Sequence, residues 1–370
     1  MGKNTPNATA FRSATEPVPG AIRPDPPIDE SPAAALLHLV GGFQVARALY
    51  VAAKLGLADL LGEGPKSGAE LAAATGTHAP SLERVMRLLA SEGVFAEDDS
   101  RRFALTPLSM PLRTHRAGSL RDLIVHQLGE ETYQAWGKLM ESVRTGATAF
   151  DRAFGVGVWE YRAHHPEYAA LFDAAMSNFS GVHIDAVLAA YPFSAFRRVV
   201  DLGGGVGKFL VALLSAHPGM KGVLFDLPHV AESAREQIAR AGLTQRCEFQ
   251  SGDIFVGVPE GADAYVLSRV IHDWDDARAL AILQNCRRAM PRDGKLLLIE
   301  RILPARAEPS PAVRSLLVTD LMMMVMNGGG ERTEEEYQGL LGAAGFAPAK
   351  VTPTSSAVNV IETEPAQAGG

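Results

Sequence analysis

The chain lacks most of the features that mark a special cellular environment. Only two of its 370 residues are cysteine, Cys247 and Cys286, and their separation fits no metal-ligand spacing. We therefore expect reduced thiols and a cytoplasmic protein. An excess of basic residues is also missing, because the net charge is −7, which disfavours a nucleic-acid partner. No apolar segment of the kind found in secretory signals follows the first residues.

An uninterrupted hydrophobic run long enough to cross a membrane is absent as well. The most apolar stretch, residues 33–61, is broken by His38, Gln44, Arg47, Lys54 and Asp59, which hydrocarbon would not accommodate. We expect a buried helix there. The composition is otherwise that of a globular protein, with 47% hydrophobic and 21% charged residues. The length predicts two or three domains.

Four regions are expected along the chain. Residues 1–30 are rich in proline and predict a disordered tail. Residues 31–115 predict three helices, the second opened by a capping box at Ser67 and Glu70, and then a β-hairpin. That order is typical of a winged helix. Residues 116–190 again predict helices, and the fourth region spans residues 191–365.

The fourth region alternates short β-rich runs with helices, which predicts a doubly wound α/β domain with a mostly parallel sheet. The expected strands are 199–202, 222–225, 247–250, 264–268 and 295–299. The expected helices are 208–216, 230–241, 275–289 and 313–326. Residues 347–352 and 357–361 predict an antiparallel hairpin at the edge of the sheet.

A glycine-rich turn follows the first strand, in Val199-Val-Asp-Leu-Gly-Gly-Gly-Val-Gly207. Open α/β sheets bind ligands outside the carboxyl ends of their strands, where glycine lets the backbone approach the ligand. The dinucleotide fingerprint fails, because Lys208 or Leu210 occupies its last glycine position, and no P-loop sequence follows. The spacing that remains is Asp201-x-Gly203-x-Gly205-x-Gly207.

Acidic residues stand at the ends of the next two strands. Asp226 ends the second strand, where a carboxylate can accept hydrogen bonds from both hydroxyls of a ribose. Asp253 follows the third strand. Each aspartate alone could equally form a turn or cap a helix. Their recurrence after the glycine turn favours a ribose-containing cofactor, although Asp226 does not distinguish a nicotinamide from a methionine-sulfonium compound.

A histidine follows the fourth strand, in Leu267-Ser-Arg-Val-Ile-His-Asp-Trp-Asp-Asp276. His272 shares a rim with the glycine turn, and a histidine of ordinary pKa can accept a proton near neutrality. The neighbouring carboxylates could suggest a divalent cation, but adjacent residues converge poorly and no second histidine completes a site, so no metal is expected. Asp275 and Asp276 are expected to cap the following helix.

These motifs together resemble the histidine-dependent, metal-independent S-adenosylmethionine O-methyltransferases, both the plant caffeate and flavonoid type and the bacterial antibiotic-tailoring type. The likeness covers roughly residues 31–365. It implies that Glu300 and Glu331 flank His272, where they would fix the imidazole tautomer and stabilise the imidazolium. Without the likeness, Glu331 would be interpreted as a charge before the helix that Thr333 and Glu336 open with a capping box.

The resemblance also assigns ligand contacts. S-adenosylmethionine, with S-adenosylhomocysteine as its product, would contact Asp201, Gly203, Gly205, Gly207, Asp226, Leu227, Gly252, Asp253, Ile254, Ser268, Arg269 and Trp274. Lysine is commoner than Arg269 in the family, and Trp274 could equally be a core anchor. The acceptor would contact Phe172, Met176, Asp273, Met323 and Asn327, although a run of methionines more often indicates core than pocket.

The expected partners are a small aromatic acceptor and a second copy of the chain. The apolar helix of residues 33–61 has more hydrophobic surface than one small module buries, which favours a homodimer through the N-terminal domain. Winged helices also bind DNA, but residues 31–115 hold eight basic and eight acidic residues and so lack a basic footprint.

The resemblance implies methyl transfer to a hydroxyl group of a small aromatic secondary metabolite, with His272 as the general base. Two alternatives stay open. The same scaffold could use the cofactor structurally in hydroxylation or decarboxylation, which the presence of His272, Glu300 and Glu331 disfavours. The chain could also be a DNA-binding regulator with a ligand-sensing domain. The sequence does not identify the acceptor.

Overall fold

The computed structural model of the chain describes residues 31–367 except positions 115 and 117, and the backbone alone of residues 177–182. The tail expected over residues 1–30 lies outside the described residues. The chain divides into two compact units, residues 1–44 and residues 45–370.

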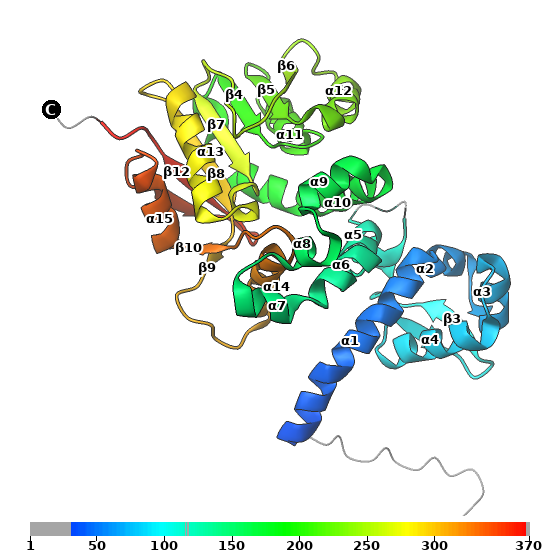
Figure 1. Cartoon of the computed structure of the whole chain (residues 1–370). Helices are drawn as coiled ribbons and strands as arrows, with labels where there is room; N and C mark the ends of the chain where they lie inside the picture. The colour runs from blue at the N-terminus through cyan, green and yellow to red at the C-terminus, as the bar shows by residue number, and fades with distance from the viewer. Residues whose placement is uncertain (1–30, 115, 117, 368–370) are drawn as a thin grey trace, which may run out of the picture. The chain divides into compact units, whose positions relative to one another are not determined.

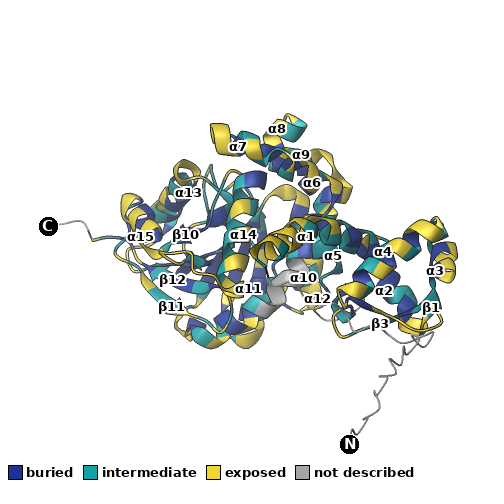
Figure 2. Ribbon diagram, turned by 90° about the horizontal axis from the view of Figure 1, so that it is seen from below, coloured by how far each residue is buried: buried dark blue, intermediate teal, exposed yellow. Residues whose placement is uncertain are grey.

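The first described helix, α1 (Pro32–Lys54), corrects the expectation of one buried helix over residues 33–61. It ends at Lys54, and Gly56 in the left-handed region separates it from α2 (Leu57–Leu60). Apolar side chains in its first half are exposed in the single chain, among them Leu37 at 69% and Phe43 at 51% (Figure 2). By length and composition α1 is also apolar enough to cross a membrane.

The predicted order of helices and hairpin is confirmed in the winged-helix module. After α2 come the 3₁₀ turn η1 (Leu61–Glu63), α3 (Gly68–Thr75), α4 (Ala79–Ser91), β2 (Phe95–Glu97) and β3 (Arg102–Leu105). Ser67 and Glu70 form the expected capping box. The strand β1 (Lys66–Ser67), which pairs with β3, was not predicted. Two residues carry no periodicity, so this strand had no signal of its own.

The middle region is helical, as predicted. After the 3₁₀ turn η2 (Met110–Leu112), its elements are α5 (Arg121–Gln127), α6 (Glu130–Trp136), α7 (Leu139–Thr145), α8 (Ala149–Phe154), α9 (Val158–His164) and α10 (Pro166–Ala190), before η3 (Phe193–Ala195). Gly146 and Gly155, both with positive φ, end α7 and α8. Phe150, Val158 and Tyr168 form a core with Val325 and Met326, and this core attaches the helices to the last domain.

A seven-stranded sheet organises the last domain, in the order β11-β12-β8-β7-β4-β5-β6. The strands are β4 (Arg198–Leu202), β5 (Lys221–Asp226), β6 (Cys247–Ser251), β7 (Ala264–Ser268), β8 (Lys295–Glu300), β11 (Lys350–Pro353) and β12 (Asn359–Thr363). The first five are parallel, and β12 and β11 are antiparallel. The doubly wound fold with an antiparallel C-terminal hairpin is therefore confirmed.

Helices cover both faces of this sheet, which is why its strands are almost continuously apolar. These helices are α11 (Lys208–Ala216), α12 (Ala231–Arg240), α13 (Asp276–Ala289) and α15 (Glu334–Ala343), with the 3₁₀ turns η4 (Pro228–Val230) and η5 (Ile271–Asp273). The helix α14 (Pro311–Met326) packs instead against α6, α7 and α8. The end of α10, α11 and α12 share one core with the sheet. A second core joins the sheet to α13 and α15, which lie beside β7, β8 and β12 (Figure 1).

The strand order reverses at β4, which pairs with β5 on one side and β7 on the other. Ligands of open α/β sheets bind at such a switch point, outside the carboxyl ends of the strands. The glycine turn after β4, Asp226 at the end of β5, η5 after β7 and Glu300 at the end of β8 all belong to this rim.

Candidate active site

His272 and Glu300 form the central contact of the rim. His272 lies in η5 and is 4% exposed, and Glu300, the last residue of β8, is fully buried. The imidazole Nδ1 lies 2.6 Å from Oε2 of Glu300. Oε1 of the same carboxylate accepts hydrogen bonds from the backbone N–H groups of Val270 at 3.0 Å and Ile271 at 2.9 Å. Glu300 therefore holds both the ring and the backbone that carries it.

Burial and charge act in opposite directions on His272. Burial is the largest effect and lowers the pKa of His272, but the Glu300 charge and hydrogen bond, together with Asp273 and Glu331, raise the pKa above the ordinary value of 6.5. Because Nδ1 faces Glu300, Nε2 is the ring nitrogen left to exchange a proton. Nε2 lies 3.7 Å from Oδ1 of Asp273.

Glu331 is the third member of this group. It is 5% exposed, so it is not a solvated charge before a helix, although the capping box of Thr333 and Glu336 is present. One side-chain atom each of His272, Glu300 and Glu331 lies within 4.8 Å of the others. Both carboxylate oxygens of Glu331 are buried and have no hydrogen-bond partner among the described residues. Burial raises the pKa of Glu331, against the charge of His272.

These three residues are the group of the described chain that could offer ligands to a metal ion. Nδ1 of His272 is already paired with Oε2 of Glu300, and Oε1 of Glu300 accepts two backbone hydrogen bonds. A metal ion would have to replace the first of these contacts. The arrangement suits an oriented histidine better than an open coordination site.

A glycine loop that the sequence analysis did not single out holds η5 from the other side. Gly330 N–H donates to the carbonyl oxygen of His272 at 2.9 Å. A Cβ on Gly329 would overlap that carbonyl and lie 2.6 Å from the backbone nitrogen of Trp274. Only glycine fits a backbone approach this close. In the sequence, the run of three glycines at residues 328–330 was the feature that could have predicted this close backbone contact.

Arg332 also fixes the backbone of η5 by hydrogen bonds. Its guanidinium donates to the carbonyl oxygens of Ile271 at 3.2 Å and Trp274 at 2.8 Å. It also pairs with Asp276 at 2.8 Å. The expectation that Asp275 and Asp276 both cap α13 is therefore half wrong. Asp275 accepts from the N–H of Arg278 as an N-cap, whereas Asp276 binds Arg332.

The glycine turn and Asp226 form a second cluster on the rim. Gly203, Gly205 and Gly207 all have positive φ. The carboxylate of Asp226 accepts from the N–H of Gly205 at 2.7 Å and of Leu227 at 2.6 Å. Burial raises the pKa of Asp226, and these two hydrogen bonds oppose the rise. Each carboxylate oxygen can accept more than one hydrogen bond, so Asp226 keeps capacity for ribose hydroxyls.

Asp201 lies behind the turn. It is fully buried, and a Cβ on Gly204 would come 2.5 Å from its Oδ2. Burial, with the charge of Asp226 adding to it, raises the pKa of Asp201 to about 7. Both of its carboxylate oxygens are buried and have no hydrogen-bond partner among the described residues.

The remaining predicted cofactor residues lie on neighbouring loops of the rim. Gly252 N–H donates to the carbonyl of Asp226 at 3.0 Å. Asp253 is exposed and accepts from Phe255 N–H at 2.8 Å, and Leu227 is 40% exposed. Ile254 packs against the sheet's second core, and Ser268 ends β7. Arg269 has a φ of 58°, a conformation that costs energy outside glycine and clusters at functional sites.

Aromatic side chains enclose one side of the site. Trp274 packs edge-to-face on Phe255 at 4.7 Å and stacks on Trp159 of α9 at 5.8 Å. Phe172 of α10 contacts Trp159 at 6.1 Å and His126 of α5 at 5.4 Å between ring centroids. Met176 lies one helical turn beyond Phe172 and is partly buried.

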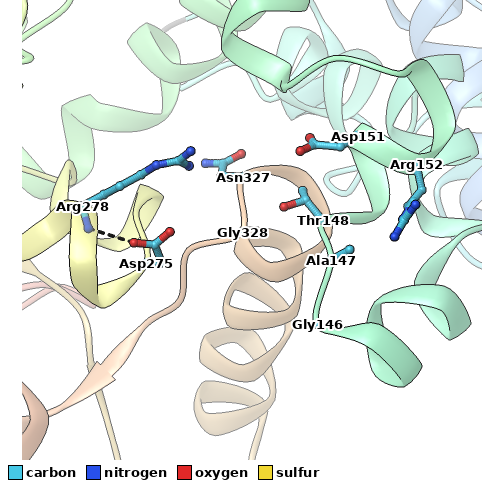
Figure 3. A pocket seen from close by; sticks show the side chains of 9 residues that line it. All are labelled: Gly146, Ala147, Thr148, Asp151, Arg152, Asp275, Arg278, Asn327 and Gly328. Carbon is cyan, nitrogen blue, oxygen red and sulfur yellow. Dashed lines mark hydrogen bonds between the residues drawn. The ribbon is translucent and has the colours of Figure 1, made fainter.

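The other predicted acceptor residues lie at the end of α14. Asn327 donates through Nδ2 to Oδ1 of Asp273 at 2.5 Å and lies 3.8 Å from the sulfur of Met323. Burial raises the pKa of Asp273, against the charges of His272 and Arg162. Beside Asn327 opens a polar cleft of about 510 Å³ lined by Thr148, Asp151, Arg152, Asp275 and Arg278. Figure 3 shows Arg278, Asn327 and Asp151 directed toward one another across it.

Comparison with known proteins decides the family. Residues 136–347 match the O-methyltransferase domain, and residues 37–114 match the O-methyltransferase dimerisation domain. The chain belongs to the O-methyltransferase family. This O-methyltransferase is 45% identical over 331 residues to the phenazine O-methyltransferase of Lysobacter antibioticus, covering 89% of this chain and 95% of that protein.

Solved structures agree with this assignment. The mitomycin 7-O-methyltransferase superposes with a TM-score of 0.86 at 37% identity, covering 90% of this chain and 98% of that one. An O-methyltransferase of neocarzinostatin biosynthesis was solved with S-adenosylmethionine and a hydroxylated naphthoic acid. It superposes with a TM-score of 0.78 at 34% identity, covering 86% of this chain and 95% of that one. The phenazine-1-carboxylate N-methyltransferase of Pseudomonas aeruginosa also matches, at 37% identity over 318 residues, 85% of this chain and 92% of that protein.

The O-methyltransferase therefore uses S-adenosylmethionine and carries a dimerisation domain. The residues of the rim fit such a cofactor. A Cβ on Gly205 would meet nothing within 4 Å, so the backbone is open to a ligand there, and Asp226 retains acceptor capacity. When bound, the cofactor supplies an electrophilic methyl group on a sulfonium sulfur.

Proposed function

We propose that this O-methyltransferase methylates a phenolic hydroxyl of a small aromatic secondary metabolite, with His272 as the general base. The observation that carries the proposal is the 2.6 Å contact between Nδ1 of His272 and Oε2 of Glu300. In a neutral imidazole with Nδ1–H donated to a carboxylate, Nε2 accepts protons. The buried pair thus presents one basic nitrogen to the rim.

The chemistry follows from that orientation. A phenol is a poor nucleophile until it loses its proton, and Nε2 of His272 takes it. The phenolic oxygen then forms the new bond to the methyl carbon as the carbon–sulfur bond breaks. Glu300 stabilises the imidazolium through its charge, as does Glu331. Trp159, Trp274 and Phe172 form an aromatic cluster that suits an aromatic acceptor.

The predicted binding residues belong to the same proposal. Asp226 would accept hydrogen bonds from the ribose, and the loop of Gly252, Asp253 and Ile254 would receive the adenine. Asp201 would contribute to the cofactor site from beneath the glycine turn, where its side chain has no exposed surface in the single chain. Met176, Met323, Asn327 and Asp273 would complete the acceptor site.

Product analysis tests this function. The protein is incubated with S-adenosylmethionine carrying a carbon-13 methyl group and a panel of hydroxylated aromatic compounds. We expect a product that gains one methylene in mass, with the methyl carbon resonance of an aryl ether. An N-methyl resonance would place the chain with its N-methylating relative, and a gain of oxygen or loss of carbon dioxide would overturn methyl transfer.

The chemistry is proposed to need no metal. Prolonged dialysis against EDTA should leave the rate of methyl transfer unchanged. A loss of activity that Mg²⁺ or Zn²⁺ restores would assign His272, Glu300 and Glu331 to a metal site instead.

We further propose a cytoplasmic homodimer through the N-terminal domain. The exposed apolar side chains of α1 support it, since a monomer rarely leaves such a face uncovered. Phe43→Glu should shift the protein toward monomer in sedimentation velocity, whereas Val143→Glu, at an exposed valine of α7 outside the N-terminal domain, should not. An unchanged dimer, or partition of the wild type into membranes, would contradict the proposal.

A further inference from the structure

We propose that Arg162 binds a carboxylate group on the aromatic acceptor, so that the preferred acceptors are aromatic hydroxy acids. The inference rests on the proposed function, because it names the substrate class of that same site. Its source is a buried arginine in α9 that the mechanism does not otherwise use.

Arg162 is enclosed by aromatic side chains. It is 8% exposed, and its guanidinium carbon lies 3.5 Å from the ring centroid of Phe172 and 4.5 Å from that of Trp159. These two rings attract the cation through their faces and carry no acceptor for its N–H groups. The ring of Tyr168 lies farther away, at 5.9 Å, and its side chain interacts with the guanidinium by a hydrogen bond.

Several of these N–H groups lack a partner. Nε and Nη1, which together carry three hydrogens, are buried and make no hydrogen bond with any described residue. The described residues also include no carboxylate within ion-pair distance of Arg162. Buried guanidinium groups are almost always paired, because an unpaired buried charge is costly. An arginine kept in this state is prepared for an anionic ligand, and a carboxylate matches its planar donors.

The position of Arg162 connects it to the reacting groups. Burial lowers the pKa of Arg162, and Tyr168 and then the charges of Asp273 and Asp173 oppose this, so Asp273 is within electrostatic reach. Asp273 lies 3.7 Å from Nε2 of His272. Trp159, which contacts the guanidinium, stacks on Trp274, and Trp274 follows His272 and Asp273 in the chain. An acceptor acid at Arg162 would therefore have its ring among these aromatic groups and near His272.

His126 does not compete for the role. Its ring lies 5.4 Å from that of Phe172, and burial, reinforced by the Arg162 charge, lowers the pKa of His126 to about 3. It is neutral at physiological pH. Arg162 thus remains the cationic donor of this aromatic cluster, which consists of His126, Trp159, Tyr168 and Phe172 around Arg162.

The test compares acids with their uncharged carboxamides. Binding of 1,4-dihydroxy-2-naphthoic acid, of 2-hydroxy-5-methyl naphthoic acid and of the two carboxamides is measured by calorimetry, with the protein saturated with S-adenosylhomocysteine. We expect the wild type to bind at least one acid about 10- to 100-fold more tightly than its amide, the size of a hydrogen bond to a charged group. Arg162→Met should remove that preference while leaving amide binding within a few-fold.

Two variants complete the experiment. Arg162→Lys should restore part of the preference, and Arg144→Met, at an exposed arginine of α7, should leave it unchanged. Equal weakening of acid and amide in Arg162→Met would show a structural role and overturn the proposal. So would a wild type that binds neither acid better than its amide, a result that needs no variant to fold. Methyl transfer to uncharged phenols, with no preference for acids over their amides, would contradict this inference but not the proposed function.

Discussion

Oε2 of Glu300 lies 2.6 Å from Nδ1 of His272, while Oε1 of the same carboxylate accepts the backbone N–H groups of Val270 and Ile271. One buried side chain therefore fixes both the orientation of the imidazole and the turn from which it projects. Charge and geometry of the base are coupled through Glu300, so replacing this residue should alter the pH dependence of the reaction as well as its rate.

For Glu300→Gln we expect the acid limb of the kcat/KM profile to move to lower pH. In the wild type the Glu300 charge raises the pKa of His272, so the base becomes available only as pH rises through a value above 6.5. With glutamine the charge is lost and burial, which lowers the pKa of His272, prevails. The plateau rate should fall by about 100-fold or more, since the tautomer is no longer set.

Profiles of wild type, Glu300→Gln and the exposed matched control Glu335→Gln would be recorded together. An acid limb that stays in place in Glu300→Gln would show that the titrating group is not His272.

Gly329→Ala should damage the site through the backbone. A Cβ there would overlap the carbonyl of His272 and displace η5 from the 328–330 loop. We expect a loss of about 1–3 kcal/mol in the free energy of unfolding, together with slower turnover. Gly339→Ala in α15, where a Cβ meets nothing within 4 Å, should instead be stabilising by about 0.5–1 kcal/mol. Denaturant titration of both variants measures this, and equal stabilities would refute the close approach.

Asp226→Asn should weaken cofactor binding. The amide loses the negative charge and one acceptor, and its NH₂ group would face either Gly205 N–H or Leu227 N–H. We expect the Kd of S-adenosylhomocysteine to rise about 10- to 100-fold. Calorimetry against Glu232→Gln, an exposed glutamate of α12, would check it. An unchanged Kd would contradict the ribose contact.

Periodicity predicted the α/β domain well because its strands and helices are long and bounded by turn residues. The five parallel strands and the capping boxes at Ser67 and Thr333 were all visible locally. The failures were of two kinds. The two-residue strand β1 is too short to have a pattern. The exposure of α1 depends on what covers it, which hydropathy alone does not reveal.

The site was predictable where a residue belongs to a motif at a strand end, as His272 and Asp226 do. The sequence did not indicate the contacts made across the fold. Arg332 reaches the carbonyls of η5 from about sixty positions away, and Gly329 is required by a backbone approach that only the structure reveals. Arg162 was not among the predicted site residues, because nothing local shows that three aromatic rings surround it.

The most direct test of the account is His272→Ala, measured for methyl transfer and for cofactor binding in the same preparation. Removing the base should lower kcat by about 10²- to 10⁴-fold, the usual contribution of a general base. The Kd of S-adenosylhomocysteine should stay within a few-fold of the wild type, because Asp226 and the glycine turn are untouched. A near-normal kcat with intact cofactor binding would contradict the role of His272.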